Sequence, residues 1–207
     1  MKLTDLKKNL NKLSKEELIR LLVELYKNNQ KNKELIGSKF DPNVEIIVFE
    51  KYREEIVEEF FPSSGQPEYP RYSNLRRALK NFKDISSDPE LTADLMITHV
   101  EKGVEFTNTY GDIDEKFYDN IERTFLNLLK HLSKHDLLTE YKYRCLEIVT
   151  ETNDIGWGFH DEITDLYYEF YSDVLSRIDS FLTDYFPFNS LLGCKKWVTK
   201  EINNFLK

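Results

Sequence analysis

Residues 88–112, DPELTADLMITHVEKGVEFTNTYGD, decide the fold. Asp88 and Pro89 form a typical helix start, because an aspartate caps free backbone N–H groups and proline fits the first turn. Gly111 is typical of the position just beyond a helix end. We therefore expect a central helix that packs against two neighbours, since its apolar residues lie on two sides. One side holds Ala93, Met96, Ile97, Val100 and Val104, and the other holds Leu91, Leu95, Phe106 and Tyr110.

Similar start signals recur on both sides of this segment. Ser14 and Glu17 match a capping box, and leucines three or four residues apart before and after Ser14 predict a short helical hairpin. Asp41 and Pro42 predict a further helix that ends near Phe60. Gly and Pro are scarce, with 7 and 6 residues, which disfavours a fold rich in strands. The sequence predicts an all-α protein, either an antiparallel helical bundle or a short stack of helical pairs.

One loop is clear from the sequence, because Pro62, Gly65, Pro67 and Pro70 crowd residues 61–72. We expect a basic helical segment over residues 1–60 and a main helical domain over residues 73–207, or one continuous domain over residues 1–207. Apolar residues at helical spacing over residues 161–185 predict one long helix, and residues 191–206 predict a last amphipathic one.

Charge is distributed unevenly along the chain. Residues 1–40 hold 10 Lys or Arg and 5 Asp or Glu, a net of +5, which leaves −13 for the rest of a chain whose total is −8. This balance argues against a surface that binds nucleic acid or an anionic membrane over its whole extent.

The sequence shows no sign of export or of a membrane span. No apolar run approaches the roughly 20 residues that a span needs, and charges interrupt the N-terminus where a signal peptide would be apolar. Cys145 and Cys194 match no metal or redox spacing, which indicates two reduced thiols. We expect a cytoplasmic protein. No particular oligomeric state is predicted.

The expected central helix carries an acidic stripe that is the first candidate site. At about 100° per residue its polar side chains fall within one sector. Carboxylates four residues apart could bind a hard cation or supply an acid and a base, although a solvated face is the simpler interpretation. The candidates that face a ligand or partner are Glu101, Glu105, Asn108, Tyr110 and Asp112.

A glycine-flanked aromatic loop is the second candidate site, with Trp157, His160 and Asp161 as its functional side chains. The free N–H groups of the following helix start could receive an anion, and His160 could carry a proton. The simpler interpretation makes Asp161 a helix cap and His160 a packed, hydrogen-bonded residue.

Catalytic and metal signatures are missing from the sequence. There is no H-E-x-x-H pair, P-loop, dinucleotide glycine motif or G-x-S-x-G elbow. We therefore expect no cofactor and assign no metal ligand or catalytic residue. A metal-assisted enzyme would need His160 to meet Glu101 and Glu105 in one pocket, and this stays an alternative.

Two groups of basic residues raise the alternative of nucleic-acid binding, chiefly through the N-terminal segment. Lysines on the polar side of amphipathic helices also keep a protein soluble, and stacking aromatics are not interleaved with them, so we expect no nucleic-acid partner. The two groups are Lys7, Lys8, Lys12, Lys15 and Arg20, and Arg71, Arg76, Arg77, Lys80 and Lys83.

Several strings together resemble a bacterial family of uncharacterised proteins, the domain of unknown function 6155. They are LSKEEL from Leu13, DPEL from Asp88, ADLM from Ala93, GVEFTNTYGDID from Gly103 and IGWGFHD from Ile155. The likeness extends from the N-terminus to about Tyr171. It implies a small bacterial helical protein and brings no activity, substrate or catalytic residue.

These observations favour a helical interaction, scaffolding or ligand-binding module over an enzyme. We expect a protein partner, bound in a groove beside the acidic stripe and the loop of residues 157–161.

Overall fold

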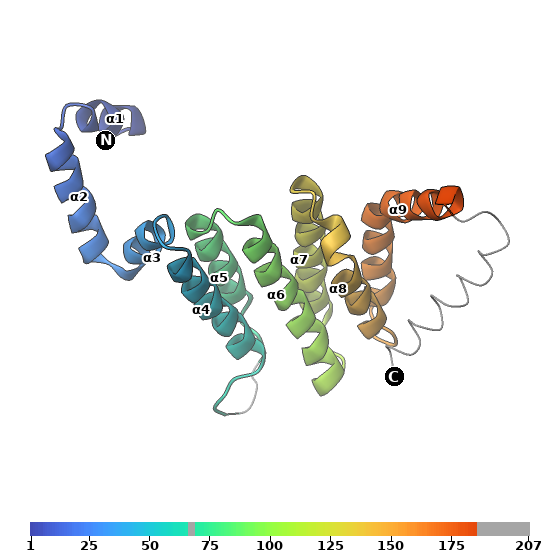
Figure 1. The fold of residues 1–207 in the computed structure, drawn as a ribbon. Coiled ribbons are helices and arrows are strands. Elements are labelled where there is room, and N and C mark those ends of the chain that lie inside the picture. The colour runs from blue at the N-terminus through green and yellow to red at the C-terminus, as the bar shows by residue number, and fades with distance from the viewer. Residues whose placement is uncertain (66–68, 186–207) are drawn as a thin grey trace. The chain divides into compact units, whose positions relative to one another are not determined.

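The computed structural model describes residues 1–65 and 69–185, and side chains as far as residue 172. Within these residues the structure has nine α-helices and no strand, so the predicted all-helical fold is confirmed (Figure 1). No helix in this part of the chain is long and apolar enough to cross a membrane. The chain divides into two compact units, residues 1–128 and residues 129–207.

The predicted helix starts have the expected caps. The Ser14 hydroxyl accepts from the Glu17 N–H at 3.2 Å, and the Glu17 carboxylate accepts from the Ser14 N–H at 2.7 Å. Asp41 accepts from the Asn43 N–H at 2.9 Å, and Asp88 accepts from the Glu90 N–H at 2.8 Å. These side chains satisfy backbone donors that have no partner within the helix itself.

The first unit holds six helices and most of a seventh. Helix α4 packs against α3, α5 and α6, and α5 packs against α3 and α6. Helix α7 continues past residue 128 into the second unit. The bounds are α1 (Leu3–Leu10), α2 (Lys15–Asn28), α3 (Gln30–Ser38), α4 (Pro42–Phe60), α5 (Tyr72–Ile85), α6 (Pro89–Tyr110) and α7 (Glu115–Lys134).

Helix α6 is the central helix that the sequence of residues 88–112 predicts. Met96 and Val100 on one side and Leu95 and Phe106 on the other are buried. Gly103 lets α7 approach closely, because a Cβ atom at this position would collide with the side chain of Ile121. Helix α6 thus packs against α4, α5 and α7.

Helix α3 is an element that the sequence analysis missed, because its polar composition is typical of a loop. The Asn29 side chain caps it by accepting from the Asn32 N–H at 2.8 Å. Glu34 is only 4% exposed and forms a 2.8 Å ion pair with Lys51 of α4. An ion pair between a buried carboxylate and an exposed lysine therefore helps to hold this helix against α4, where apolar residues are few.

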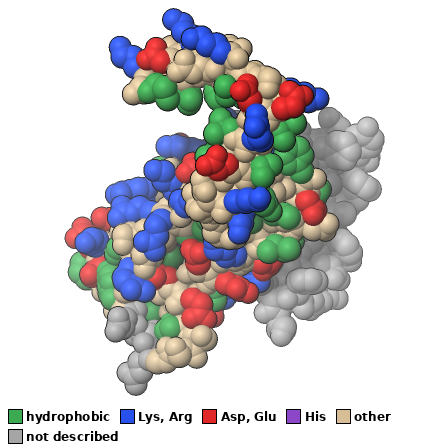
Figure 2. Space-filling view, turned by 90° about the vertical axis from the view of Figure 1, so that its left-hand side faces the viewer, with side chains coloured by type: hydrophobic (Ala, Val, Ile, Leu, Met, Phe, Trp, Pro, Cys, Tyr) green, Lys and Arg blue, Asp and Glu red, His purple; other side chains and the backbone are tan. Residues whose placement is uncertain are grey.

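The hairpin of α1 and α2, hereafter the N-terminal hairpin, buries none of its residues. Figure 2 shows hydrophobic side chains along the lower side of α1, the helix at the top of the view, and Lys and Arg side chains on its upper side. The hairpin's exposed apolar residues are Leu3, Leu6, Leu13, Ile19, Leu21, Leu22, Val23, Leu25 and Tyr26.

The second unit contains α8 (Leu138–Glu151) and α9 (Phe159–Tyr185), which pack against each other. The predicted long run of helical spacing is one helix, which changes direction along its length (Figure 1). Cys145 is buried and forms no disulfide within the described residues. The predicted helix over residues 191–206 and Cys194 lie outside the described residues. The domain division predicted at residues 61–72 stays a prediction.

Candidate functional site

The acidic stripe on α6 is mostly exposed. Glu105 forms an ion pair with Lys102 in the preceding turn, with 2.5 Å between Nζ and Oε2. Asp112 accepts a 3.3 Å hydrogen bond from the buried Tyr118 hydroxyl of α7. Asn108 is also exposed, whereas Glu101 is half-buried. Glu101 and Asn108 each interact with another group of the protein.

Tyr110, the aromatic member of the predicted site, belongs to an aromatic cluster rather than to the stripe. Its ring centroid lies 4.9 Å from that of Phe106 and 6.1 Å from that of Phe61. About half of the side chain is exposed. Tyr110 therefore packs at the end of α6, and its contact with a ligand or partner stays a prediction.

In the predicted aromatic loop, Trp157 has a left-handed backbone with φ of +63° and is 61% exposed. His160 Nδ1 lies 2.9 Å from the hydroxyl of the buried Thr152. This contact joins the ends of α8 and α9, in agreement with the simpler interpretation of a hydrogen-bonded histidine. The interpretation of Asp161 as the helix cap is wrong, because α9 begins two residues earlier at Phe159. Asp161 is exposed in the first turn of α9, where the helix dipole favours an acid.

The stripe and the loop belong to different units, so the predicted groove beside both stays a prediction, as does the metal-assisted alternative. Among the residues whose side chains are described, no group of three or more His, Cys, Asp or Glu could hold a metal ion.

A different site arises along α5, which carries basic residues on two of its sides. Arg77 lines a groove of about 580 Å³ toward α3 and α4, whereas Arg76, its neighbour in the chain, lines a groove toward α7. One helical residue step rotates a side chain by about 100°, which explains this divergence.

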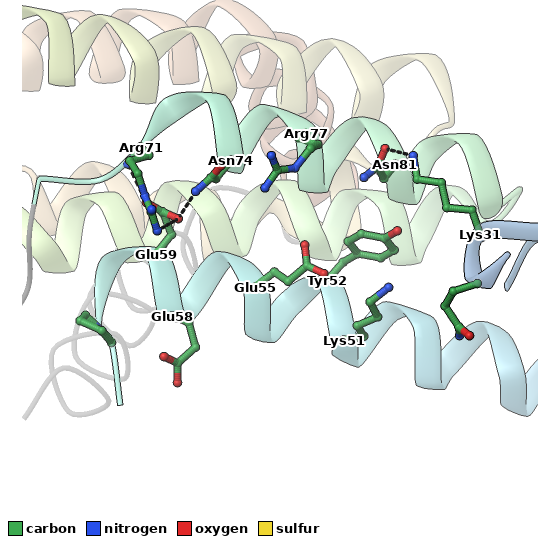
Figure 3. Close-up of a pocket in the computed structure, with 12 residues that line it drawn as sticks. Lys31, Lys51, Tyr52, Glu55, Glu58, Glu59, Arg71, Asn74, Arg77 and Asn81 are labelled. Carbon is green, nitrogen blue, oxygen red and sulfur yellow. Dashed lines mark hydrogen bonds and ion pairs between the residues drawn. The ribbon is translucent and has the colours of Figure 1, made fainter. Parts of the chain in front are cut away.

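In the groove between α4 and α5, acidic and basic side chains lie close to one another and nearly balance in number (Figure 3). Glu59 holds Arg71 at 2.8 Å and accepts from the Asn74 amide at 2.8 Å. Burial alone would raise the pKa of Glu59, but these hydrogen bonds hold it below its usual value. Arg77 of α5 and Glu55 of α4 both extend into the space between their helices (Figure 3).

The groove between α5 and α7, hereafter the basic groove, has two neighbouring cavities of about 480 and 400 Å³. They share Tyr72 and Arg76 of α5 and Asn120 and Arg123 of α7, so the two cavities adjoin each other along these side chains. The first cavity adds Tyr69, Pro70, Arg71, Ser73, Lys116 and Asp119. The second adds Leu79, Lys80, Lys83, Asp84, Met96, His99, Thr124 and Asn127.

Cations outnumber carboxylates in the second cavity. Arg76, Lys80, Lys83 and Arg123 line it, against one acid, Asp84. Of the salt bridges among the described residues, none involves any of these four cations. Desolvation lowers the pKa of Lys83, as expected of an ammonium group in a partly enclosed place.

The floor of the second cavity holds a buried histidine of α6. His99 is 2% exposed, and neither ring nitrogen has a hydrogen-bond partner. Burial lowers the pKa of His99 to about 4, so the imidazole is neutral at pH 7. A neutral imidazole offers one donor and one acceptor, and a buried polar group normally has a partner for them.

Tyrosine hydroxyls fix the other end of the basic groove. The Tyr72 hydroxyl donates to that of Tyr69 at 2.7 Å, and the Tyr69 hydroxyl donates to Asp114 at 2.6 Å. Asp114 also accepts from the Phe117 N–H at 2.8 Å, which places the chain of hydrogen bonds at the start of α7. Burial raises the pKa of Tyr72 to about 12, so its hydroxyl stays protonated.

Only part of this site was predictable from the sequence. Arg76, Lys80 and Lys83 stand out there as basic residues, with a solvated face as the simpler interpretation, whereas Arg123 and His99 were not predicted. Two signals could have found the rest: one histidine within the largely apolar stretch of residues 95–100, and polar residues at helical spacing on α7, at 116, 120, 123 and 127.

The chain matches the family of unknown function DUF6155 over residues 1–171. It belongs to that family. The match covers both the basic groove and the loop of residues 157–161, and it confirms the resemblance from which DUF6155 was predicted; the bacterial origin stays a prediction. No curated protein and no solved structure matches the chain.

Proposed function

We propose that this protein is a helical binding module that holds an anionic ligand in the basic groove. One observation carries the proposal: Arg76, Lys80, Lys83 and Arg123 converge on one cavity, and no carboxylate pairs with any of them. Like charges in a partly enclosed place repel one another, and a bound anion would relieve that repulsion.

The type of cation favours oxyanions. Arg76 and Arg123 stand on opposite helices, and guanidinium groups form paired hydrogen bonds with phosphate or carboxylate oxygens. The absence of catalytic motifs in the sequence favours binding over turnover. We therefore expect the bound anion to be held unchanged.

Calorimetric titration with inorganic tripolyphosphate at low salt tests the proposal. Arg76→Gln and Arg123→Gln should each weaken binding by about tenfold or more, because each removes a charge-assisted hydrogen bond. Arg77→Gln is the matched control, since Arg77 has the same charge one residue away but faces α4. Equal losses in Arg76→Gln and Arg77→Gln, or no binding by the unaltered protein, would contradict the proposal.

The N-terminal hairpin favours a second candidate function, docking of a protein partner. Nine large apolar side chains are exposed over residues 3–26, which is more than scattered surface residues require. Lys8 and Arg20 are exposed on the same two helices, so a partner with acidic edges fits. A partner retained by the full chain should be lost when residues 1–28 are removed and kept by Arg76→Gln.

A further inference from the structure

The rim and the floor of the second cavity of the basic groove differ in charge and in burial. Arg76, Lys80 and Arg123 are exposed at the rim, whereas Met96 and His99 of α6 are buried beneath them. Leu79 adds a second apolar side chain to the lining. The cavity therefore suits a ligand with a charged end and an uncharged body, and its 400 Å³ are enough for a small organic molecule.

The floor of the cavity also restricts which uncharged groups the ligand can carry there. A hydrocarbon placed over His99 would leave the ring nitrogens without a partner, at a free-energy cost. Both nitrogens are themselves buried, so a heterocycle with its own donors and acceptors would reach them through a small movement of the floor. Met96 lies one turn from His99 on the same helix, and its flexible side chain lets the floor adapt to a planar group.

Helix α7 supplies further polar groups at the same place. Asn127 lines the cavity, and its exposed amide makes no hydrogen bond within the described residues. An amide presents two donors and an acceptor, a combination that reads the edge of a nucleobase or binds sugar hydroxyls. Thr124 lies beside it, with its hydroxyl donated to the Asn120 carbonyl at 2.9 Å.

We infer that the basic groove binds a nucleoside phosphate, with the phosphates between Arg76 and Arg123 and the base over Met96 and His99 beside Asn127. This inference rests on the proposed function, because it names the class of anion that the groove holds. A single nucleotide would occupy the second cavity, while the first cavity, lined by Lys116, receives any further phosphates.

Titration calorimetry with three diphosphates separates this inference from the proposed function. The probes are pyrophosphate, the nucleoside diphosphates ADP and UDP, and geranyl diphosphate, which carries a hydrocarbon body. We expect ADP or UDP to bind at least about tenfold more tightly than pyrophosphate, through contacts of the base with the floor. Geranyl diphosphate should bind no more tightly than pyrophosphate.

Two variants test the floor and the rim separately. His99→Phe keeps an aromatic ring and removes both nitrogens, and Asn127→Ala changes an exposed residue that the fold does not need. Each should weaken nucleoside diphosphate binding several-fold and leave pyrophosphate binding unchanged. Arg77→Gln should change neither.

Each outcome decides between the two statements. If pyrophosphate binds and the nucleoside diphosphates bind no more tightly, the inference fails while the proposed function stands. Tighter binding of geranyl diphosphate than of ADP and UDP also overturns the inference, in favour of a hydrocarbon-bearing phosphate. If none of the probes binds, both statements fail.

Discussion

At the scale of single residues, His99 links stability to pH. Its pKa is about 4 in the folded protein, against an ordinary value of 6.5. Between these two values the unfolded chain takes up a proton and the folded chain does not. The free energy of unfolding therefore falls as the pH falls from 6.5 to 4, by up to about 3 kcal/mol, and this group causes no further loss below pH 4.

Replacement of His99 by leucine tests this link. His99→Leu should leave stability at pH 7 equal or higher, because it removes a buried polar group that has no partner. At pH 5 the variant should be more stable than the unaltered protein by about 2 kcal/mol, as measured by urea denaturation. His135→Asn, at an exposed position, is the control. An unchanged slope of stability against pH in His99→Leu would refute the argument.

Single residues also show where the sequence gives too little information. Ser14, Asp41 and Asp88 were predictable as caps, because a cap acts on the backbone two or three residues away. The environments of Glu34 and His99 were not predictable, because each depends on residues of another helix. A charged residue in a polar segment and a histidine in an apolar one gain their roles only through packing.

At the scale of helices, the close approach of α6 and α7 depends on Gly103. A methyl group added there would collide with Ile121, and the overlap should exceed the gain of about 1 kcal/mol in helix propensity. We expect Gly103→Ala to lower the free energy of unfolding by about 1 to 2 kcal/mol. Denaturant unfolding with Ile121→Val as the second substitution is the measurement. Because valine lacks the atom nearest to the new methyl group, the double variant should lose less than the sum of the single losses.

Helix positions were more predictable than helix partners. Apolar spacing and caps located α2, α4, α6 and α9, because these signals are local. They did not locate α3, whose helical state depends on contacts of Glu34 with Lys51 and Tyr52 of α4. They also could not show that α5 and α7 share a groove, since residues 76 and 123 are far apart in the chain.

At the scale of the whole molecule, the N-terminal hairpin contributes little to the cores. None of its residues is buried, and α2 contacts only α3 among the pairs of helices that pack closely. Removal of residues 1–28 should therefore shift the thermal unfolding midpoint by only a few degrees. Circular dichroism of both chains is the measurement. Loss of cooperative unfolding in the shortened chain would show that the hairpin supports the fold.

The net charge of the whole chain also explains why the basic groove was not predicted. The net charge of −8 and the acidic remainder of the chain argue against a whole surface that binds nucleic acid or an anionic membrane, and they give no sign of a local basic site. A ligand experiences the nearby side chains instead, because charges beyond about 10 Å are largely screened at moderate salt. The net charge of the chain is negative, but this value does not describe the surface between α5 and α7.

The unburied hairpin has a consequence for how the chain exchanges its amide protons. Helices of 8 and 14 residues are near the lower limit of stability in water, and these two lack a core to hold them closed. Their backbone hydrogens should exchange with deuterium through brief local opening, at free energies well below that of global unfolding. The first 28 residues would thus become labelled long before α6, and any partner that covers the hairpin would reveal itself by slowing that labelling.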